Sequence, residues 1–368
     1  MQGLLPSRPM IGAVPPRGAV SVPVRSGAPC IVESRRLPAC AEISASWSAL
    51  AKHAVTANPF FEPGFLLPAA QHLVAFRDVS VLLVWQDSTG GQERRLVGFM
   101  PYRRKARMLR GESVTGCEDD RLLCDWPLID RDAALPVAGA LLRALRANGM
   151  MGEGLRVHGL APDNPLRLLL ATAARLEGLA IIASLRAPRP ASGSAGPGPQ
   201  FSLQEARNQS ELRDGVEILM ALEASGATGR AGSAAVQDNR EAAFLRAMSR
   251  NLAREKLCRV SLLMDASRTV AAALTLGRGK RRWLYKAAAE EAGNQQETRD
   301  RQDGLLALIQ RSSPGLELLG LGDQFVLPAS AGMPVHDLAL SDPSPRRPVD
   351  LARRLRASLD RGLFRPRP

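Results

Sequence analysis

The sequence has few of the residues that most often carry covalent, metal or stacking chemistry. Its 368 residues include five cysteines, four histidines and only 4% aromatic residues. The cysteines stand at positions 30, 40, 117, 124 and 258, odd in number and widely spaced, which indicates neither a disulfide framework nor a zinc cluster. The histidines are too dispersed to predict a metal site. We therefore expect free thiols in a reducing compartment.

Long apolar runs are also missing. No segment is long and apolar enough to predict a membrane span, and the first residues lack the uninterrupted apolar core of a secretory signal. These absences predict a soluble, cytoplasmic protein without a transmembrane segment. The hydrophobic content of 45% is enough for sizeable cores, and the length predicts roughly two domains.

Basic charge, by contrast, is abundant. The net charge of +13 comes almost wholly from arginine, and an excess of this size raises nucleic acid as a partner. The arginines are scattered, however, and no basic run alternates with aromatic residues as single-strand binding favours. We therefore predict no nucleic-acid partner. A nucleic-acid binder is kept as a third hypothesis, which predicts a steep salt dependence.

Composition divides the chain into five segments. Residues 1–42 are rich in proline, glycine and arginine with little periodicity, which predicts a disordered lead-in. A first domain is expected over residues 43–187. The run PRPASGSAGPGPQ cannot form a packed element, so a linker is expected over residues 188–203. A second domain follows over 204–345, and residues 346–368 form a basic tail.

Helical and strand periods alternate on both sides of this linker. In the second half they predict two helices, a hairpin, a further strand, a polar loop, a helix and a last strand: Leu212–Ala224, Asn239–Arg254, Val260–Met264 with Val270–Leu276, Arg281–Ala287, Glu290–Asp303, Gly304–Gln310 and Leu316–Leu321. The first half repeats a looser version of this order. The predicted fold class is α/β, with a mixed sheet in each half.

A glycine-rich turn followed at once by an amphipathic helix occupies residues 219–248. The turn holds Gly226, Gly229 and Gly232, which are expected to adopt backbone angles closed to other residues or to allow close approach of another segment. It has neither the Gly-Lys-Ser/Thr of a phosphate loop nor a Gly-x-Ser-x-Gly elbow, because Ala235 stands where the second glycine would be needed. A tight backbone path is therefore the expected role.

This stretch closely resembles the hallmark segment of the CelD-type, cellulose-biosynthesis-associated branch of the GNAT N-acetyltransferases. Matching positions are Leu222, Glu223, Gly226, Gly229, Arg230, Gly232 and Ala234. Further segments match the same family in order: NPFFEP at 58–63, LVGFMPY at 96–102, WLYK at 283–286, and the pair Asp323 and His336. The resemblance implies tandem GNAT-like acyl-CoA N-acyltransferase domains. It also implies acetyl-CoA as co-substrate, no metal, a small-molecule or saccharide amine as acceptor, and a link to exopolysaccharide or cellulose production.

The resemblance also implies where the co-substrate binds. A GNAT enzyme offers a strand edge to the pantetheine amides and a helix N-terminus to the pyrophosphate. We therefore expect Tyr285, Lys286 and Ala287 to line the cofactor arm. The phosphate site is expected at the amides of Asp303, Gly304 and Leu305, with added charge from Arg299 and Arg301. For removal of the acceptor proton the candidates are Glu223, Asp323 and His336.

Each of these assignments has an alternative. Tyr285 is also explained by core packing, Glu223 by a surface position on a helix, Asp323 by a turn, and His336 by a solvated loop. In addition, relatives carry Ser-Pro-Gly before the last helix, where this chain has Arg-Gln-Asp-Gly. That departure favours a second hypothesis, a catalytically degenerate GNAT-fold scaffold of a polysaccharide-synthesis system. The acceptor, the acyl chain and the oligomeric state are left open.

Overall fold

The first half of the chain is built on an antiparallel sheet. The computed structural model describes residues 20–22, 29–87, 94–107, 111–148, 155–161, 163–186, 201–206, 208–291, 295–319 and 335–341. The strands pair in the order β1-β2-β3-β4-β5, and β6 adds to β4. Their bounds are β1 Val20–Val22, β2 Cys30–Arg36, β3 Ser80–Asp87, β4 Arg94–Arg107, β5 Gly111–Gly116 and β6 Leu128–Ile129.

Helices of the first half follow its apolar periods. They are η1 Leu37–Ile43, α1 Ser44–His53, η2 Pro59–Phe61, α2 Pro63–His72, α3 Val74–Arg77, α4 Ala134–Ala147 and α5 Pro165–Leu176. Helix α5 starts where a start is expected, because the Asn164 side chain accepts a hydrogen bond from the Leu166 N–H at 3.0 Å and Pro165 takes the first helical position.

The predicted lead-in over residues 1–42 is wrong at its C-terminal end. Strand β2 pairs with β3 over its whole length, and the side chains of Cys30, Leu37 and Cys40 are fully buried. The alternation in CIVESRR is only seven residues long and borders a proline-rich stretch. Its partner strand lies far along the chain, so the local pattern carried too little signal to be assigned.

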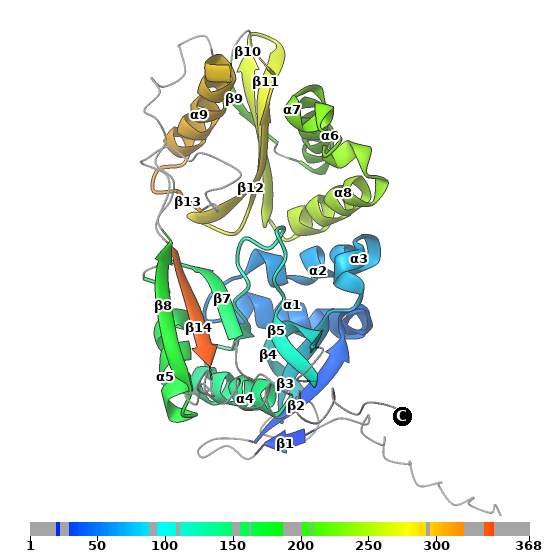
Figure 1. Cartoon of the computed structure of the whole chain (residues 1–368). Coiled ribbons are helices and arrows are strands. Elements are labelled where there is room, and N and C mark those ends of the chain that lie inside the picture. Colours follow the sequence, from blue (N-terminus) through cyan, green and yellow to red (C-terminus); the bar gives the residue numbers. More distant parts are fainter. Residues whose placement is uncertain are drawn as a thin grey trace, which may run out of the picture.

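The second half contains a five-stranded sheet in the order β13-β12-β11-β10-β9. The strands are β9 Phe201–Glu205, β10 Cys258–Asp265, β11 Arg268–Leu276, β12 Arg281–Ala289 and β13 Glu317–Leu319, of which only the β12–β13 pair is parallel. Its helices are α6 Gln209–Ser225, α7 Ala227–Arg230, η3 Ala235–Gln237, α8 Asn239–Arg254 and α9 Gln295–Ser312. Helices α6 and α8 cover one face and α9 the other (Figure 1). The predicted α/β class is therefore confirmed, and the second half has the predicted mixed sheet. The strand pairs described in the first half are all antiparallel, so a mixed sheet in each half is not found.

One strand of the second half belongs to a sheet of the first. Strand β14, Val335–Ser341, lies between β7, Leu155–Leu160, and β8, Ala180–Arg186, and runs antiparallel to both. Figure 1 shows it among the elements of the first half. The predicted domain bounds of 43–187 and 204–345 do not anticipate this exchange. Most of the predicted linker lies outside the described residues, and β9 begins within it.

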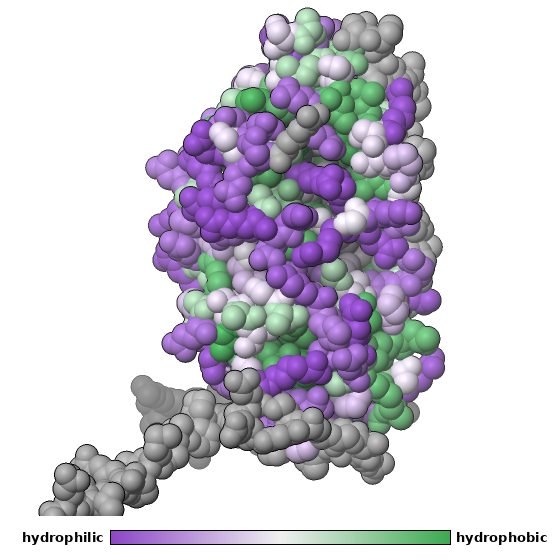
Figure 2. All heavy atoms as spheres, turned by 180° about the vertical axis from the view of Figure 1, so that it is seen from behind, coloured by the Kyte–Doolittle hydropathy of each residue, from purple (hydrophilic) through white to green (hydrophobic). Residues whose placement is uncertain are grey.

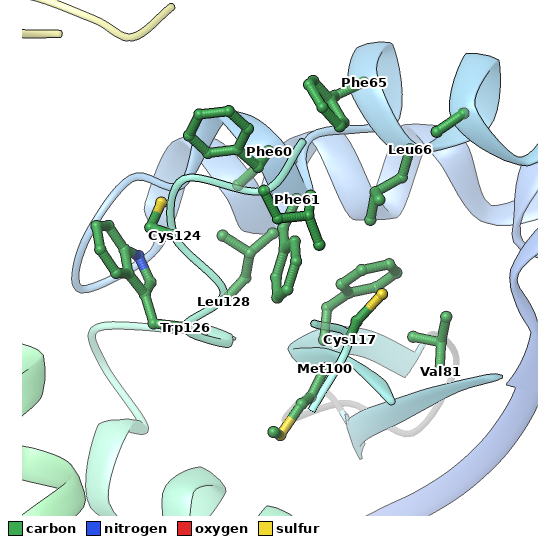
Figure 3. Packing of buried hydrophobic residues seen from close by; sticks show 14 of the residues in the cluster. Phe60, Phe61, Phe65, Leu66, Val81, Met100, Cys117, Cys124, Trp126 and Leu128 are labelled. Carbon is green, nitrogen blue, oxygen red and sulfur yellow. The ribbon is translucent and has the colours of Figure 1, made fainter. Parts of the chain in front are cut away.

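The two halves share one continuous apolar core. Phe60 and Phe65, from the NPFFEP segment and α2, contact the Tyr285 ring with centroid distances of 6.0 and 5.8 Å. Trp283 of β12 packs against Phe60 at 5.9 Å. Figure 3 shows Phe60 and Phe65 on one side of their backbone segment and Phe61 on the other, directed into the first half. The motif thus joins β12 to the first half, a role its sequence did not indicate.

A buried carboxylate lies at this junction. Glu62, the residue before α2, is 5% exposed. Burial raises its pKa to about 7, although Arg278 partly opposes the shift. Nearby, Lys52 of the first half forms an ion pair with Glu255 of the second at 2.9 Å. The junction therefore contains an ionisable group whose charged form is disfavoured by its surroundings.

The rear face of the molecule is mostly hydrophilic. Figure 2 shows polar side chains over much of it, with apolar ones gathered at the lower right and the upper right. Large exposed apolar residues include Leu168 and Leu176 of α5 and Ile182 of β8. No helix in the described part of the chain combines the length and apolarity that a bilayer crossing requires. All five cysteines are buried free thiols.

Candidate active site

Strand β12 has an open edge at the centre of the second half. Strand β13 pairs with it only at residues 281–283. Among the described residues, positions 284–289 therefore have no strand beside them on that side. Backbone N–H and C=O groups on such an edge can bind the amides of an extended ligand. The predicted residues Tyr285, Lys286 and Ala287 lie on this edge.

A β-bulge on this part of β12 changes the directions in which its side chains point. Thr275 of β11 faces Leu284, and the next pair is Leu274 with Lys286, so Tyr285 is the extra residue. A bulge breaks the alternation of side chains between the two faces of a sheet. As a result, Tyr285 packs against the first half while Lys286, its neighbour, reaches α6 on the same face.

A pocket of about 400 Å³ opens beside this bulge. Its walls come from three places: the loop after β5 in the first half, the glycine turn with the start of α8, and β12. The lining residues are Asp120, Arg121, Leu123, Gly232, Ser233, Ala234, Ala235, Gln237, Asp238, Glu241, Leu245, Tyr285 and Lys286. This size is in the range of small-ligand sites, which commonly lie where two structural units meet.

The glycine turn wraps closely around the end of α6. A Cβ atom on Gly229 would lie 1.8 Å from the Ala224 carbonyl oxygen, so only glycine fits there. Gly232 has φ +72°, a left-handed conformation that favours glycine. Gly226 has neither constraint, because its nearest neighbour would be 3.6 Å away. Two of the three predicted glycine roles are therefore found.

Glu223 is held at the pocket by two hydrogen bonds. Its Oε1 accepts from Lys286 Nζ at 2.6 Å, and its Oε2 accepts from the Ala235 N–H at 3.0 Å. Both side chains of the ion pair are largely buried. The structure thus gives Glu223 a position next to the predicted cofactor arm, where it fixes both Lys286 and the turn. Its suggested role as proton acceptor stays a prediction.

An arginine from the first half closes the other side of the pocket. Arg121 donates from Nε and Nη2 to Glu241 Oε2 at 3.0 and 2.9 Å, and from Nη1 to Asp119 at 3.1 Å. A bidentate guanidinium–carboxylate pair fixes both partners in orientation as well as distance. The pocket therefore depends on both halves, and a fragment of either one lacks part of its wall.

Tyr285 presents a neutral phenol to the pocket. The residue is 9% exposed, and its hydroxyl makes no hydrogen bond among the described residues. Burial, followed by the charge of Glu241, raises its pKa well above the ordinary value. The aromatic contacts above show that the packing role considered for Tyr285 is real. The hydroxyl is nevertheless available to a ligand.

The predicted phosphate site is not a helix N-terminus. Helix α9 begins at Gln295, so Asp303, Gly304 and Leu305 lie in its interior, where backbone amides are already used by the helix. Arg301 donates to Glu290 at 3.1 Å and to Glu297 at 3.4 Å. Its charge is thus largely compensated. The Arg299 side chain lies outside the described part of the structure.

The remaining catalytic candidates are not brought to the pocket by the described structure. Asp323 lies outside the described residues. His336 is in β14, where its backbone pairs with Leu160 and Leu185 of the first half. His336 was expected in a loop after the last strand of the second half. This prediction is wrong, because the residue lies in a strand of the first-half sheet.

Sequence reasoning missed the pocket residues of the first half and of the α8 start. Arg121 and Asp120 sit in an irregular loop, and their partner Glu241 is far along the chain. Asp238 had a usable signal: it stands just before a helical period with Glu241 three residues on, the pattern of an N-cap. The structure confirms that Asp238 accepts from the Arg240 N–H at 2.8 Å.

Comparisons with known proteins give a similarity of fold at low identity. No protein-family model matches the chain, and no curated protein matches it. The structure is similar to the C-terminal domain of a protein assigned as a lysylphosphatidylglycerol synthetase from Agrobacterium fabrum, with 11% identity, 87% of this chain and 96% of that one covered, and a TM-score of 0.46. It is also similar to L-PGS from Bacillus licheniformis, with 9% identity, 86% and 97% coverage, and a TM-score of 0.42.

A third similar structure is a tandem GNAT protein from the clavulanic acid biosynthesis pathway. It has 12% identity to this chain, coverage of 85% and 99%, and a TM-score of 0.36. Nothing about substrate follows from similarity at this level. Nothing in the comparisons concerns the CelD-type branch, which stays a prediction.

Proposed function

We propose that the second half is an acyltransferase of the GNAT type, which transfers an acyl group from an acyl-CoA to an amine. The observation that carries the proposal is the open edge of β12 with its bulge at Tyr285, directly beside a pocket of about 400 Å³. The edge supplies backbone groups for the pantetheine amides, and the pocket receives the acceptor. The two reactants thus meet at Tyr285.

In the proposed reaction the acceptor nitrogen bonds to the thioester carbonyl carbon and the carbon–sulfur bond breaks. Tyr285, neutral because burial raises its pKa, donates its phenolic proton to the sulfur that leaves. Glu241 lines the pocket and accepts a proton from the nitrogen, while Asp119 still balances the charge of Arg121. That proton then returns to Tyr285, which restores both groups. Lys286 and Arg121 act by position, because carboxylates neutralise their charges.

The finer assignments rest on the sequence resemblance. They are acetyl-CoA as the donor, a small-molecule or saccharide amine as the acceptor, catalysis without a metal, a cytoplasmic location, and a link to cellulose or exopolysaccharide production. None of them is needed for the chemistry proposed at Tyr285. Each is therefore open to a separate test.

The chain offers a matched pair of variants for the test, because it has two tyrosines. Tyr285→Phe removes the proposed acid, and we expect kcat with acetyl-CoA and a set of primary amines to fall about a hundredfold, with an unchanged Kd for acetyl-CoA. Tyr102→Phe removes a hydroxyl that bonds Ser34 in the first half, and kcat should not change. Release of the CoA thiol measures kcat. Full activity in Tyr285→Phe would remove Tyr285 from the mechanism.

A non-catalytic scaffold is the second candidate, and one observation favours it. The first turn of α9 contains Glu297, and a carboxylate there opposes a phosphate. With Arg301 engaged by Glu290 and Glu297, the described part of α9 offers little to a pyrophosphate. Calorimetric titration with acetyl-CoA, with CoA as control, separates the two candidates. Absence of binding at millimolar acetyl-CoA would favour the scaffold.

A further inference from the structure

The pocket beside β12 is acidic although the protein is basic. The chain has a net charge of +13, yet the ionisable side chains that line the pocket are Asp120, Asp238, Glu241, Arg121 and Lys286. The two cations are already matched, Lys286 by Glu223 and Arg121 by Glu241. The pocket is therefore negative whereas the whole molecule is positive. Its negative charge comes from the two carboxylates that have no cation paired with them.

These two carboxylates are Asp120 and Asp238. Neither forms an ion pair within the described part of the chain. Asp238 caps α8 through the Arg240 N–H, a hydrogen bond that leaves its negative charge uncompensated. Asp120 is exposed at the wall contributed by the first half. The carboxylates thus face the pocket from opposite halves of the protein.

Acidic side chains alone do not make a site, but here they surround a largely buried tyrosine. Tyr285 is 9% exposed and lines the same pocket, and its hydroxyl has no hydrogen bond among the described residues. Leaving such a hydroxyl unpaired is unfavourable unless a ligand or water satisfies it. The pocket lining therefore has a polar group to be hydrogen-bonded, the Tyr285 hydroxyl, and negative charge to be balanced.

A simple amine does not use both features during acyl transfer. Its nitrogen must be uncharged to attack the thioester, so at the moment of reaction a monoamine leaves Asp120 and Asp238 unbalanced. A second ammonium on the same molecule would stay charged throughout. It would be attracted to the two carboxylates while the reacting nitrogen lies at Tyr285.

We propose that the acceptor is a diamine or oligoamine, held by an ammonium between Asp120 and Asp238 while another of its nitrogens reacts beside Tyr285. This inference rests on the proposed acyl transfer, because it names the class of acceptor for the same site. It makes Asp120 and Asp238 specificity-determining residues. Their removal should change which amine binds, and leave the chemical step as it is.

The test compares three probes of similar size by calorimetric titration, first without any acyl-CoA: 1,4-diaminobutane, 1-aminobutane and 4-aminobutanoate. We expect the diamine to bind about tenfold more tightly than the monoamine, and the amino acid to bind most weakly because its carboxylate is repelled. At an ionic strength of about 1 M the advantage of the diamine should largely vanish.

Variants then separate charge from shape. Asp120→Asn and Asp238→Asn should each weaken diamine binding about threefold, and together about tenfold, with little change for the monoamine. Asparagine keeps the ability of residue 238 to cap α8, so the fold should be retained. Asp265→Asn, at the β10–β11 turn and outside the pocket, is the matched control and should change nothing.

Failure of this inference can be distinguished from failure of the proposed function. Equal binding of diamine and monoamine, or a preference that Asp120→Asn/Asp238→Asn leaves intact, would overturn the acceptor class even if acetyl transfer to monoamines is observed. Selective diamine binding that depends on both carboxylates supports the acceptor class. If such binding is found without any release of CoA thiol, the acyl-transfer proposal fails and the diamine site stands.

Discussion

Replacing the three glycines of the turn by alanine, one at a time, tests how the turn positions Glu223. The three positions share chemistry and sequence neighbourhood but differ in geometry. At Gly229 the new Cβ would meet the Ala224 carbonyl oxygen at 1.8 Å and its carbon at 2.5 Å. At Gly232 the space is open, but φ is +72°. At Gly226 the nearest atom would be 3.6 Å away and φ is −98°.

These geometries predict a clear order of stabilities. Gly229→Ala pushes two backbone segments apart by more than an ångström, and we expect a loss of about 3 kcal/mol or more in the free energy of unfolding. Gly232→Ala places a side chain in the left-handed region, at a cost of about 1–2 kcal/mol, which reduced flexibility of the unfolded chain partly offsets. Gly226→Ala should be neutral or slightly stabilising.

Urea unfolding followed by tryptophan fluorescence measures these differences, because Trp126 and Trp283 lie at the junction of the halves. Gly229→Ala should also lower acyltransferase activity beyond its effect on folding. The Gly229 carbonyl accepts a hydrogen bond from Gln237 Nε2 at 2.8 Å, and the turn it anchors carries the Ala235 N–H that binds Glu223. The same unfolding midpoint for Gly229→Ala and Gly226→Ala would show that the Ala224 carbonyl does not approach Gly229 closely.

Three further predictions concern charged groups. Because burial raises the pKa of Glu62 to about 7, the folded state holds this proton more tightly than the unfolded chain does, so the stabilisation is full below about pH 4.5 and is lost as the pH rises through 7. In urea titrations, Glu62 should lower the free energy of unfolding by roughly 3 kcal/mol as the pH rises from 4.5 to 7. In Glu62→Gln this decrease with pH should be smaller. The same pH dependence in both proteins would contradict the prediction. In a double-mutant cycle of Glu223→Gln and Lys286→Met, we expect a coupling energy of about 1–3 kcal/mol, and additive effects would show that the ion pair does not form. Finally, Arg301→Ala and Asp303→Asn should leave the Kd for acetyl-CoA unchanged within about twofold, because neither residue lies at the start of α9; a larger change in calorimetry would restore the phosphate site expected from sequence.

Local patterns predicted those elements whose signals lie within one segment. Helix α8 has the predicted bounds, because an N-cap aspartate and a helical apolar period mark it clearly. Helix α9 was expected to start at Gly304, after a polar loop over Glu290–Asp303, but it begins at Gln295. A competing signal was present: Asn294 stands three residues before Glu297, the spacing of a capping pattern.

Only the parts of the site that are formed by residues adjacent in the sequence could be predicted. The segment Trp283 to Lys286 was matched by resemblance, and in the structure its residues from Leu284 onward lie on an open strand edge. In contrast, the pair Arg121 and Glu241 joins residues that are 120 positions apart, and no periodicity reports such a contact. The bulge at Tyr285 also depends on the register of β11 against β12, which the single strand does not contain.

The return of β14 to the first half has a consequence for the order of folding. Strands β7 and β8 lie on opposite sides of β14 and pair with each other only through it, yet β14 follows the entire second half in the chain. During synthesis the first half therefore waits, with two strand edges unpaired, until residues 335–341 leave the ribosome. Contacts of such long sequence separation form slowly, and unpaired edges invite aggregation meanwhile. Emergence of β14, rather than completion of the first half, should thus mark the point at which the first half becomes resistant to proteolysis.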